Sequence, residues 1–229
     1  AINGGVSQDF EGGRIYWRPN NYAYAVRGAV GATYFAWGAS DGALGFPTSD
    51  EAPTDDGTIQ TFQNGTIAWK NSGGTVVNVV KGGIGDTFTA MGNSAYGLLG
   101  LPTSNEITLP NGWYQQFQGG RIYWSGPTGG HMVRGGIGDS YINQGASTGL
   151  LGLPTSSEIS ADGGSYQVFQ GGRIYWKDGL GNATVRGAML DEYLKLGASS
   201  GLLQFPRAGE AAINGGVSQD FEGGRIYWR

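Results

Sequence analysis

The chain has 229 residues and a formal net charge of −4, with only 14% charged residues, which argues against the basic surface that a nucleic-acid backbone requires. Hydrophobic residues make up 39% and aromatic residues 12%, too much for a disordered linker. The absence of cysteine excludes a disulfide framework and a thiolate metal site. No apolar stretch approaches the roughly 18 residues of a membrane-spanning helix. We therefore expect a folded protein without a nucleic-acid partner or a membrane span.

A ten-residue phrase recurs five times along the chain, at spacings of 52, 55, 52 and 52 residues. Its copies are QDFEGGRIYW from Gln8, QTFQNGTIAW from Gln60, QQFQGGRIYW from Gln115, QVFQGGRIYW from Gln167 and QDFEGGRIYW from Gln219. A repeat of this size buries too little apolar surface to be stable alone, so it must pack against its neighbours. We predict a single tandem-repeat domain over 1–229, with repeats at about 8–59, 60–114, 115–166 and 167–218 and a partial repeat at 219–229.

Each phrase predicts a β-hairpin in which two glycines, Gly12 and Gly13 in the first copy, form the turn. Alternation along the strands then sorts the side chains onto two faces. We expect the face with phenylalanine, isoleucine and tryptophan to be the core side and the face with arginine and tyrosine to be accessible. In the first copy the two faces consist of Gln8, Phe10, Ile15 and Trp17 on the core side and Asp9, Glu11, Arg14 and Tyr16 on the other.

A Val-Arg-Gly or Val-Lys-Gly step follows each of the first four hairpins and is interpreted as a short third strand. Apolar residues four positions apart come next, such as Val30 and Tyr34, and end at a glycine such as Gly38, which is typical of a two-turn helix. A turn of the type Leu44-Gly45-Phe46-Pro47 then ends the helical region. A glutamate returns after every such turn, as Glu51, Glu106, Glu158 and Glu210.

The first 18 residues are identical to the last 18, so the end hairpins can occupy one kind of position. We predict an α+β fold in which hairpin and short-helix repeats form a closed or nearly closed, pseudo-symmetric, propeller-like ring. If the ring holds five hairpins, its ends meet and the protein is a monomer, which is the expected state. If it holds four, the surplus hairpin can enter a neighbouring molecule and build end-swapped oligomers.

The arginine and tyrosine of the accessible face are the candidate ligand-binding residues. A planar guanidinium beside an amphipathic ring suits sugar hydroxyls and the apolar faces of sugar rings. The alternative is structural, with arginine paired to the repeat glutamate or across the turn and tyrosine packed against the next repeat. The predicted carbohydrate-binding residues are Arg14, Tyr16, Arg121, Tyr123, Arg173, Tyr175, Arg225 and Tyr227, with Glu51, Glu106 and Glu158 orienting the arginines.

No catalytic site is predicted. His131 is the only histidine and has no serine motif beside it, and the recurring acids come once per repeat, whereas an enzyme usually needs one unlike constellation. Neither a metal nor a cofactor is expected.

The ordered motifs, Leu-Gly-Phe/Leu-Pro-Thr-Ser with a following glutamate, then Gln-x-Phe-x-Gly-Gly-x-Ile-Tyr-Trp, then Val-Arg-Gly, resemble the LGFP repeat family over nearly the whole chain. This resemblance implies a secreted, envelope-associated protein of actinobacteria and non-catalytic attachment to the cell wall through a polysaccharide such as arabinogalactan. The alternative is a protein-interaction or self-assembling scaffold built from the swappable identical end hairpins.

Overall fold

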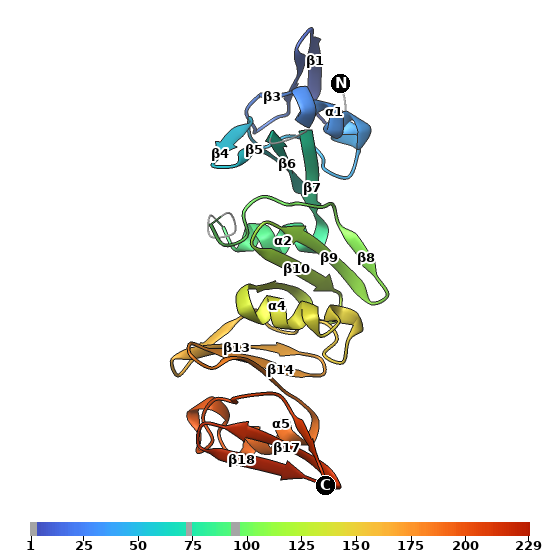
Figure 1. The fold of residues 1–229 in the computed structure, drawn as a ribbon. Helices are drawn as coiled ribbons and strands as arrows, with labels where there is room; N and C mark the ends of the chain where they lie inside the picture. The colour runs from blue at the N-terminus through green and yellow to red at the C-terminus, as the bar shows by residue number, and fades with distance from the viewer. Residues whose placement is uncertain (1–3, 72–74, 93–96) are drawn as a thin grey trace. The chain divides into compact units, whose positions relative to one another are not determined.

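The computed structural model describes residues 4–71, 75–92 and 97–229. Figure 1 shows short helices alternating with small sheets along this chain. The chain divides into two compact units, Ala1–Ser125 and Gly126–Arg229, and each is described here by itself. That all repeats form one domain stays a prediction.

The first compact unit contains three groups of antiparallel strands and the helices between them. The strand orders are β1-β2-β3, β4-β5-β6-β7 and β10-β9-β8. The strands are β1 Val6–Phe10, β2 Gly13–Trp17, β3 Tyr24–Arg27, β4 Ala52–Thr54, β5 Gly57–Phe62, β6 Gly65–Asn71, β7 Thr75–Lys81, β8 Ile107–Leu109, β9 Gly112–Phe117 and β10 Gly120–Ser125. The helices are α1 Gly28–Ala36, the 3₁₀ helix η1 Ala39–Asp41 and α2 Gly82–Ala90.

The second compact unit continues the same alternation. After β11 and α4, its sheets have the orders β12-β13-β14-β15 and β16-β17-β18. The strands are β11 Gly129–Arg134, β12 Ile159–Ala161, β13 Gly164–Phe169, β14 Gly172–Lys177, β15 Gly181–Val185, β16 Ala211–Ile213, β17 Gly216–Phe221 and β18 Gly224–Trp228. The helices are α4 Gly135–Asn143, η2 Ala146–Thr148, α5 Gly187–Lys195 and η3 Ala198–Ser200.

The predicted closed, propeller-like ring is wrong. Over the described residues the chain forms separate small antiparallel sheets, none of which closes or curls into a barrel or propeller, and the fold is mostly β with few helices. The physical reason is the position of each helix, which has apolar contacts on two sides. Helix α1 contacts β3 of its own repeat and β6 of the next, and α2 likewise contacts β7 and β10. Repeats in each unit therefore join face to face through a helix.

The predicted register of the hairpin is also wrong, by one residue on each strand, although the predicted faces are right. Phe10 pairs with Gly13, so Glu11 and Gly12 form the turn. Gly13 is required instead by a close approach of β3, because a Cβ at this position would lie 2.7 Å from the Val26 carbonyl oxygen. Because the turn moves by one residue, the partner of each residue changes by two positions, so Gln8 pairs with Ile15 and every residue keeps its original face.

Helices α1, α4 and α5 are each tied to the turn that follows them by a buried tyrosine, whereas α2 has Phe88 at the equivalent position. The Tyr34 hydroxyl donates to the Gly45 carbonyl oxygen at 2.7 Å. Gly45 has a φ of +67°, in the left-handed region that favours glycine, which explains the glycine of the Leu-Gly-Phe-Pro turn. The last copy keeps this geometry with a non-glycine residue, since Gln204 has a φ of +54° and its carbonyl oxygen accepts from Tyr193 at 2.5 Å.

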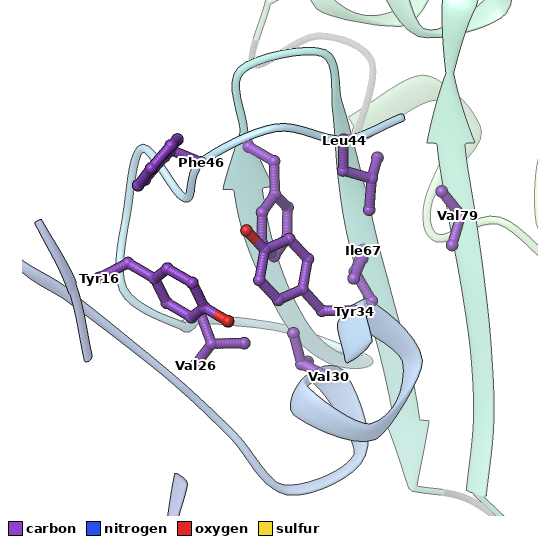
Figure 2. Packing of buried hydrophobic residues seen from close by; sticks show 9 residues of the cluster. Tyr16, Val26, Val30, Tyr34, Leu44, Phe46, Ile67 and Val79 are labelled. Carbon is purple, nitrogen blue, oxygen red and sulfur yellow. The ribbon is translucent and has the colours of Figure 1, made fainter. Parts of the chain in front are cut away.

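The core of the first unit shows helix α1 packed between the first hairpin and the second (Figure 2). The cluster combines Tyr16 from the first hairpin, Tyr34 from α1, and Phe62 and Ile67 from the next hairpin. The ring of Tyr34 stacks on Phe62 at 4.6 Å and meets Tyr16 edge to face at 5.4 Å. The phenylalanine face thus packs against the preceding helix, and the tyrosine face against the helix that follows.

Candidate functional site

The predicted binding tyrosines lie in the core, with one exception. Tyr16, Tyr123 and Tyr175 are 1%, 2% and 1% exposed, while Tyr227 is 62% exposed. Burial raises the pKa of the three buried hydroxyls. The prediction of an accessible tyrosine face is therefore wrong for these three residues. For Tyr16 and Tyr175 the reason is that the helix of the same repeat, α1 or α5, covers that face. A buried ring has no free surface on which a sugar can stack.

The predicted arginines lie at the rim of the tyrosine face and are held by their neighbours. The guanidinium of Arg121 donates to the Tyr123 hydroxyl at 3.2 Å and lies 5.2 Å from the centre of the Tyr114 ring. Arg173 lies over the Tyr166 ring in the same way, at 5.1 Å.

In the end hairpins the arginine also binds an aspartate on the opposite strand. Arg14 pairs with Asp9, and Arg225 pairs with Asp220. These hydrogen bonds raise the pKa of both guanidinium groups. Their anchoring favours the structural alternative, and a ligand-binding role for the arginines stays a prediction.

The repeat glutamates do not orient these arginines, so that part of the prediction is wrong. Three of them, Glu51, Glu106 and Glu210, face the cation of the third strand, at the N-terminus of the helix. The measured pairs are Arg27 with Glu51 at 4.0 Å, Lys81 with Glu106 at 3.7 Å and Arg186 with Glu210 at 3.3 Å. Glu158 instead accepts a hydrogen bond from the Ser165 hydroxyl at 2.6 Å.

Tryptophan, which the sequence placed in the core, lies at the edge of its hairpin face and reaches the surface. Trp176 is 37% exposed and Trp228 is 53% exposed. The ring packs on the helix start, where glycine leaves room for it. A Cβ on Gly83 would lie 2.1 Å from the Trp124 ring nitrogen, and one on Gly136 would lie 3.1 Å from Trp176. The half-exposed indole therefore lies beside the same helix N-terminus as the cation.

The first of these sites is a groove of about 340 Å³ that we call the tryptophan groove. Its residues are Gly12, Arg27, Gly28, Ala29, Val30, Glu51 and Trp69. It combines an indole, an apolar helix start and a charged pair in which the side chain of Arg27 is 69% exposed. Such a combination offers both a flat apolar surface and several hydrogen-bonding groups to a polar ligand.

The third hairpin carries two neighbouring tryptophans at the equivalent edge. Trp113 and Trp124 are cross-strand partners with ring centres 5.5 Å apart, and Trp113 is 36% exposed. The pair of Lys81 and Glu106 lies at the start of α2, two residues before the glycine that Trp124 covers. We call Trp113, Trp124, Lys81 and Glu106 the double-tryptophan site.

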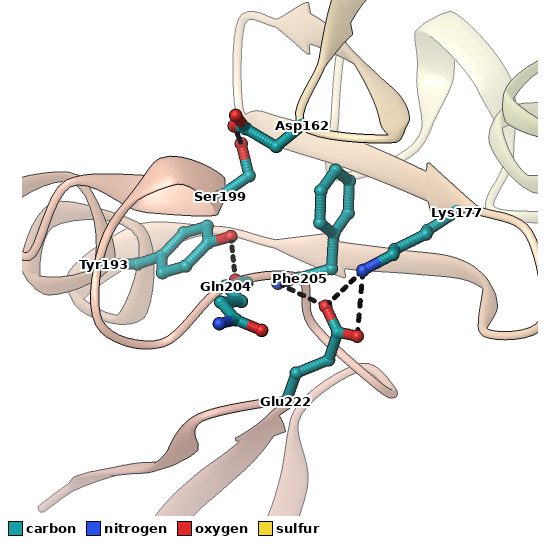
Figure 3. A network of polar contacts seen from close by, with 7 residues as sticks. All are labelled: Asp162, Lys177, Tyr193, Ser199, Gln204, Phe205 and Glu222. Atoms are coloured by element: carbon teal, nitrogen blue, oxygen red, sulfur yellow. Dashed lines mark hydrogen bonds and ion pairs between the residues drawn. The ribbon is translucent and has the colours of Figure 1, made fainter.

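A second polar cluster in the second unit serves the fold (Figure 3). Lys177 bonds both carboxylate oxygens of Glu222 at 2.9 Å, and the Phe205 amide donates to the same carboxylate at 3.1 Å. Asp162 accepts from the Ser200 hydroxyl at 2.5 Å. Because these groups bind one another, the cluster joins the turn after α5 to its neighbouring strands.

The comparisons with known proteins support the assignment from the motifs. In the described part of the chain, no helix is long and apolar enough to cross a membrane. The comparison with curated proteins gives no match. The family model described as the LGFP repeat matches five times, at residues 1–42, 44–95, 99–149, 151–201 and 203–229. LGFP repeats are associated with cell-envelope proteins. Because the matches cover nearly all of the sequence, the chain belongs to the LGFP repeat family.

Proposed function

We propose that this chain is a secreted, non-catalytic attachment domain that binds a cell-envelope polysaccharide such as arabinogalactan through its tryptophan edges. The observation that carries this proposal is the recurrence of a surface-reaching indole beside a charged pair. Trp69 lies beside Arg27 and Glu51, and Trp124 lies at the helix start that carries Lys81 and Glu106.

The chemistry of the groove matches that of a sugar. A sugar ring has an apolar C–H face that packs on an indole, and hydroxyls at its edge that bind charged and polar groups. Glu51 and Arg27 supply an acceptor and a donor at one rim, and the side chain of Glu51 keeps 21% of its surface exposed. The site therefore suits a neutral, hydroxyl-rich ligand.

Repetition compensates for the small size of each site. Individual open grooves bind weakly, but several grooves on one chain hold a polymer by raising the effective concentration of the next sugar. A polysaccharide presents the same residue many times, as the chain presents its grooves. A groove that recurs from repeat to repeat therefore fits attachment to a polymer better than catalysis.

The test is retention of the full chain on purified cell-wall polysaccharide. Trp113→Ala removes one of the two indoles of the double-tryptophan site, and we expect a loss of about 1 kcal/mol in binding free energy, or about five-fold in retention. Trp113→Phe should recover most of it because it keeps an aromatic ring. Tyr22→Ala is the matched control, since Tyr22 is an 80% exposed aromatic residue outside the site. Equal retention of Trp113→Ala and the wild type would contradict the assignment to tryptophan.

A second variant examines the arginines predicted from the sequence. The double substitution Arg121→Gln, Arg173→Gln leaves the buried tyrosines in place and removes both guanidinium charges. If the arginines bind the glycan, retention falls in this variant as well. If tryptophan carries binding, retention stays near the wild-type value while Trp113→Ala still loses it.

A further inference from the structure

The hairpins at the two ends of the chain have one sequence and one register. The first 18 residues and the last 18 are identical. In the N-terminal hairpin, β1–β2, Phe10 pairs with Gly13, and in the C-terminal hairpin, β17–β18, Phe221 pairs with Gly224. Both hairpins therefore present the same side chains at the same positions.

The C-terminal hairpin is bound to an apolar surface of the second unit, which we call the α5 surface. It consists of Met189 and Tyr193 from α5 and of Leu203 and Phe205 from the turn that follows. Phe221 inserts into this surface, where it is 3% exposed and its ring centre lies 4.6 Å from that of Tyr193.

Polar contacts fix the hairpin on the α5 surface. The side-chain amide of Gln219 donates to the carbonyl oxygens of Thr184 at 2.9 Å and Ala208 at 2.8 Å. The amide of Gly223 donates to the Leu203 carbonyl oxygen at 2.9 Å. The ion pair of Glu222 with Lys177, also at 2.9 Å, adds a charged contact.

The N-terminal hairpin carries every one of these groups and leaves them uncovered. Phe10, the equivalent of Phe221, is 52% exposed, and Gln8, the equivalent of the buried Gln219, is exposed. This face lines an open groove of about 470 Å³ formed by Val6, Ser7, Gln8, Phe10, Ile15 and Trp17. The opposite face, around Tyr16, is already packed against α1.

We propose that the Phe10 face of the N-terminal hairpin is a self-association surface, and that its partner is the α5 surface of a second copy of this chain. The incoming hairpin takes the place of that copy's own C-terminal hairpin. Phe10, Gln8 and Glu11 then make the contacts that Phe221, Gln219 and Glu222 make within one molecule. At this junction the incoming hairpin lies between α5 of one copy and its own α1. The second hairpin of the first unit lies between α1 and α2 in the same way.

The two occupants compete for one surface with the same side chains. The C-terminal hairpin is tethered to α5, and a tethered segment has an effective concentration in the millimolar range. The wild-type chain is therefore monomeric in dilute solution, and exchange appears when the tethered hairpin is weakened. Each copy has one Phe10 face and one α5 surface, so association runs head to tail without an upper limit.

Phe221→Asp in the full chain tests the proposal by light scattering over a range of micromolar concentrations. A carboxylate at this buried position releases the tethered hairpin, because an unpaired charge cannot be buried on the α5 surface. We expect the average mass to rise with concentration to at least twice the single-chain mass of 24.0 kDa. The double variant Phe10→Asp, Phe221→Asp should return to the single-chain mass.

Tyr227→Asp is the matched control, since it places the same charge on the uncovered face of the same hairpin and should remain monomeric. A single-chain mass for Phe221→Asp at every concentration would overturn the proposal. So would equal association of the double variant, which would indicate aggregation through the emptied α5 surface. The mass is measured without glycan, so this result is independent of wall binding.

Discussion

The N-terminal and C-terminal hairpins are the most informative pair of regions in this molecule, because an identical sequence is buried on opposite faces. Phe10 is 52% exposed and Phe221 is 3% exposed, whereas Tyr16 is 1% exposed and Tyr227 is 62% exposed. The hairpins have the same register, so the difference does not come from their own backbone. It comes from the neighbouring helix, which is α1 on the tyrosine side in one case and α5 on the phenylalanine side in the other.

The comparison shows that the hairpin is a two-sided spacer. Its phenylalanine side binds the preceding helix and its tyrosine side binds the helix that follows, so either side is stable against water only when its helix is present. The energetic role of a residue in this fold is therefore set by position in the array as much as by residue type. Paired substitutions at equivalent positions measure this dependence directly.

The largest difference is expected for phenylalanine. Phe221→Ala should lower the free energy of unfolding of the second unit by about 3–5 kcal/mol, because it leaves a cavity against Tyr193. Phe10→Ala changes an exposed residue and should stay within about 0.5 kcal/mol. Urea unfolding, with hydrogen exchange to locate the weakened unit, measures both. Equal losses in the two variants would contradict the assignment of faces.

Tyrosine should give the reverse order. Tyr16→Ala removes a buried ring that contacts Tyr34 and Phe46, so a loss of about 3 kcal/mol is expected in the first unit. Tyr227→Ala should cost less than about 1 kcal/mol because its ring is mostly in water. The same unfolding experiment applies, and a costly Tyr227→Ala would show that an unidentified contact covers this face.

Local patterns of the sequence predict the elements and the faces of each hairpin. The alternation along the strands separates Phe10 from Tyr16 correctly even though the turn is displaced. The displacement changes each cross-strand partner by two residues, and side chains two residues apart lie on the same face. The Leu-Gly-Phe-Pro turns and the helices that precede them were equally clear. These features depend on residues close to one another in the chain.

Contacts between repeats could not be predicted in this way. The arginine and tyrosine face was expected to be accessible, yet Thr66 and Ala68, which replace these two residues in the second hairpin, are buried, at 8% and 3% exposure. The replacement of arginine and tyrosine by two small uncharged residues is the feature of the sequence that indicates that this face is buried. The tryptophan edge was missed because its exposure depends on Gly83 and Gly136, which belong to the helix of the preceding repeat.

Glutamine provides a finer comparison of the two ends. Gln219 is 1% exposed and donates to two carbonyl oxygens, which lose their donor in Gln219→Ala. A loss of about 1–3 kcal/mol in the second unit is expected. Gln8 is exposed, so Gln8→Ala should change stability by no more than about 0.5 kcal/mol. Thermal unfolding of both variants checks the difference, and a neutral Gln219→Ala would mean that water replaces the side chain at no cost.

The smallest difference is expected for the turn glutamates and depends on pH. The hydrogen bond from Lys177 lowers the pKa of Glu222 below its ordinary value of 4.5, so the folded state holds the ionised carboxylate more strongly than the unfolded state does. The resulting stabilisation is complete above the unfolded pKa and is lost as the pH falls through the lower, folded pKa. Glu222→Gln should therefore lose less stability than the wild type between about pH 6 and pH 3, as measured by urea unfolding at each pH.

Glu11 is the matched control. It is exposed and forms none of the ion pairs found among the described residues, so Glu11→Gln should retain the acid sensitivity of the wild type. If Glu222→Gln and Glu11→Gln reduced the pH dependence of stability equally, the contact with Lys177 would not be its cause, because only Glu222 has that contact.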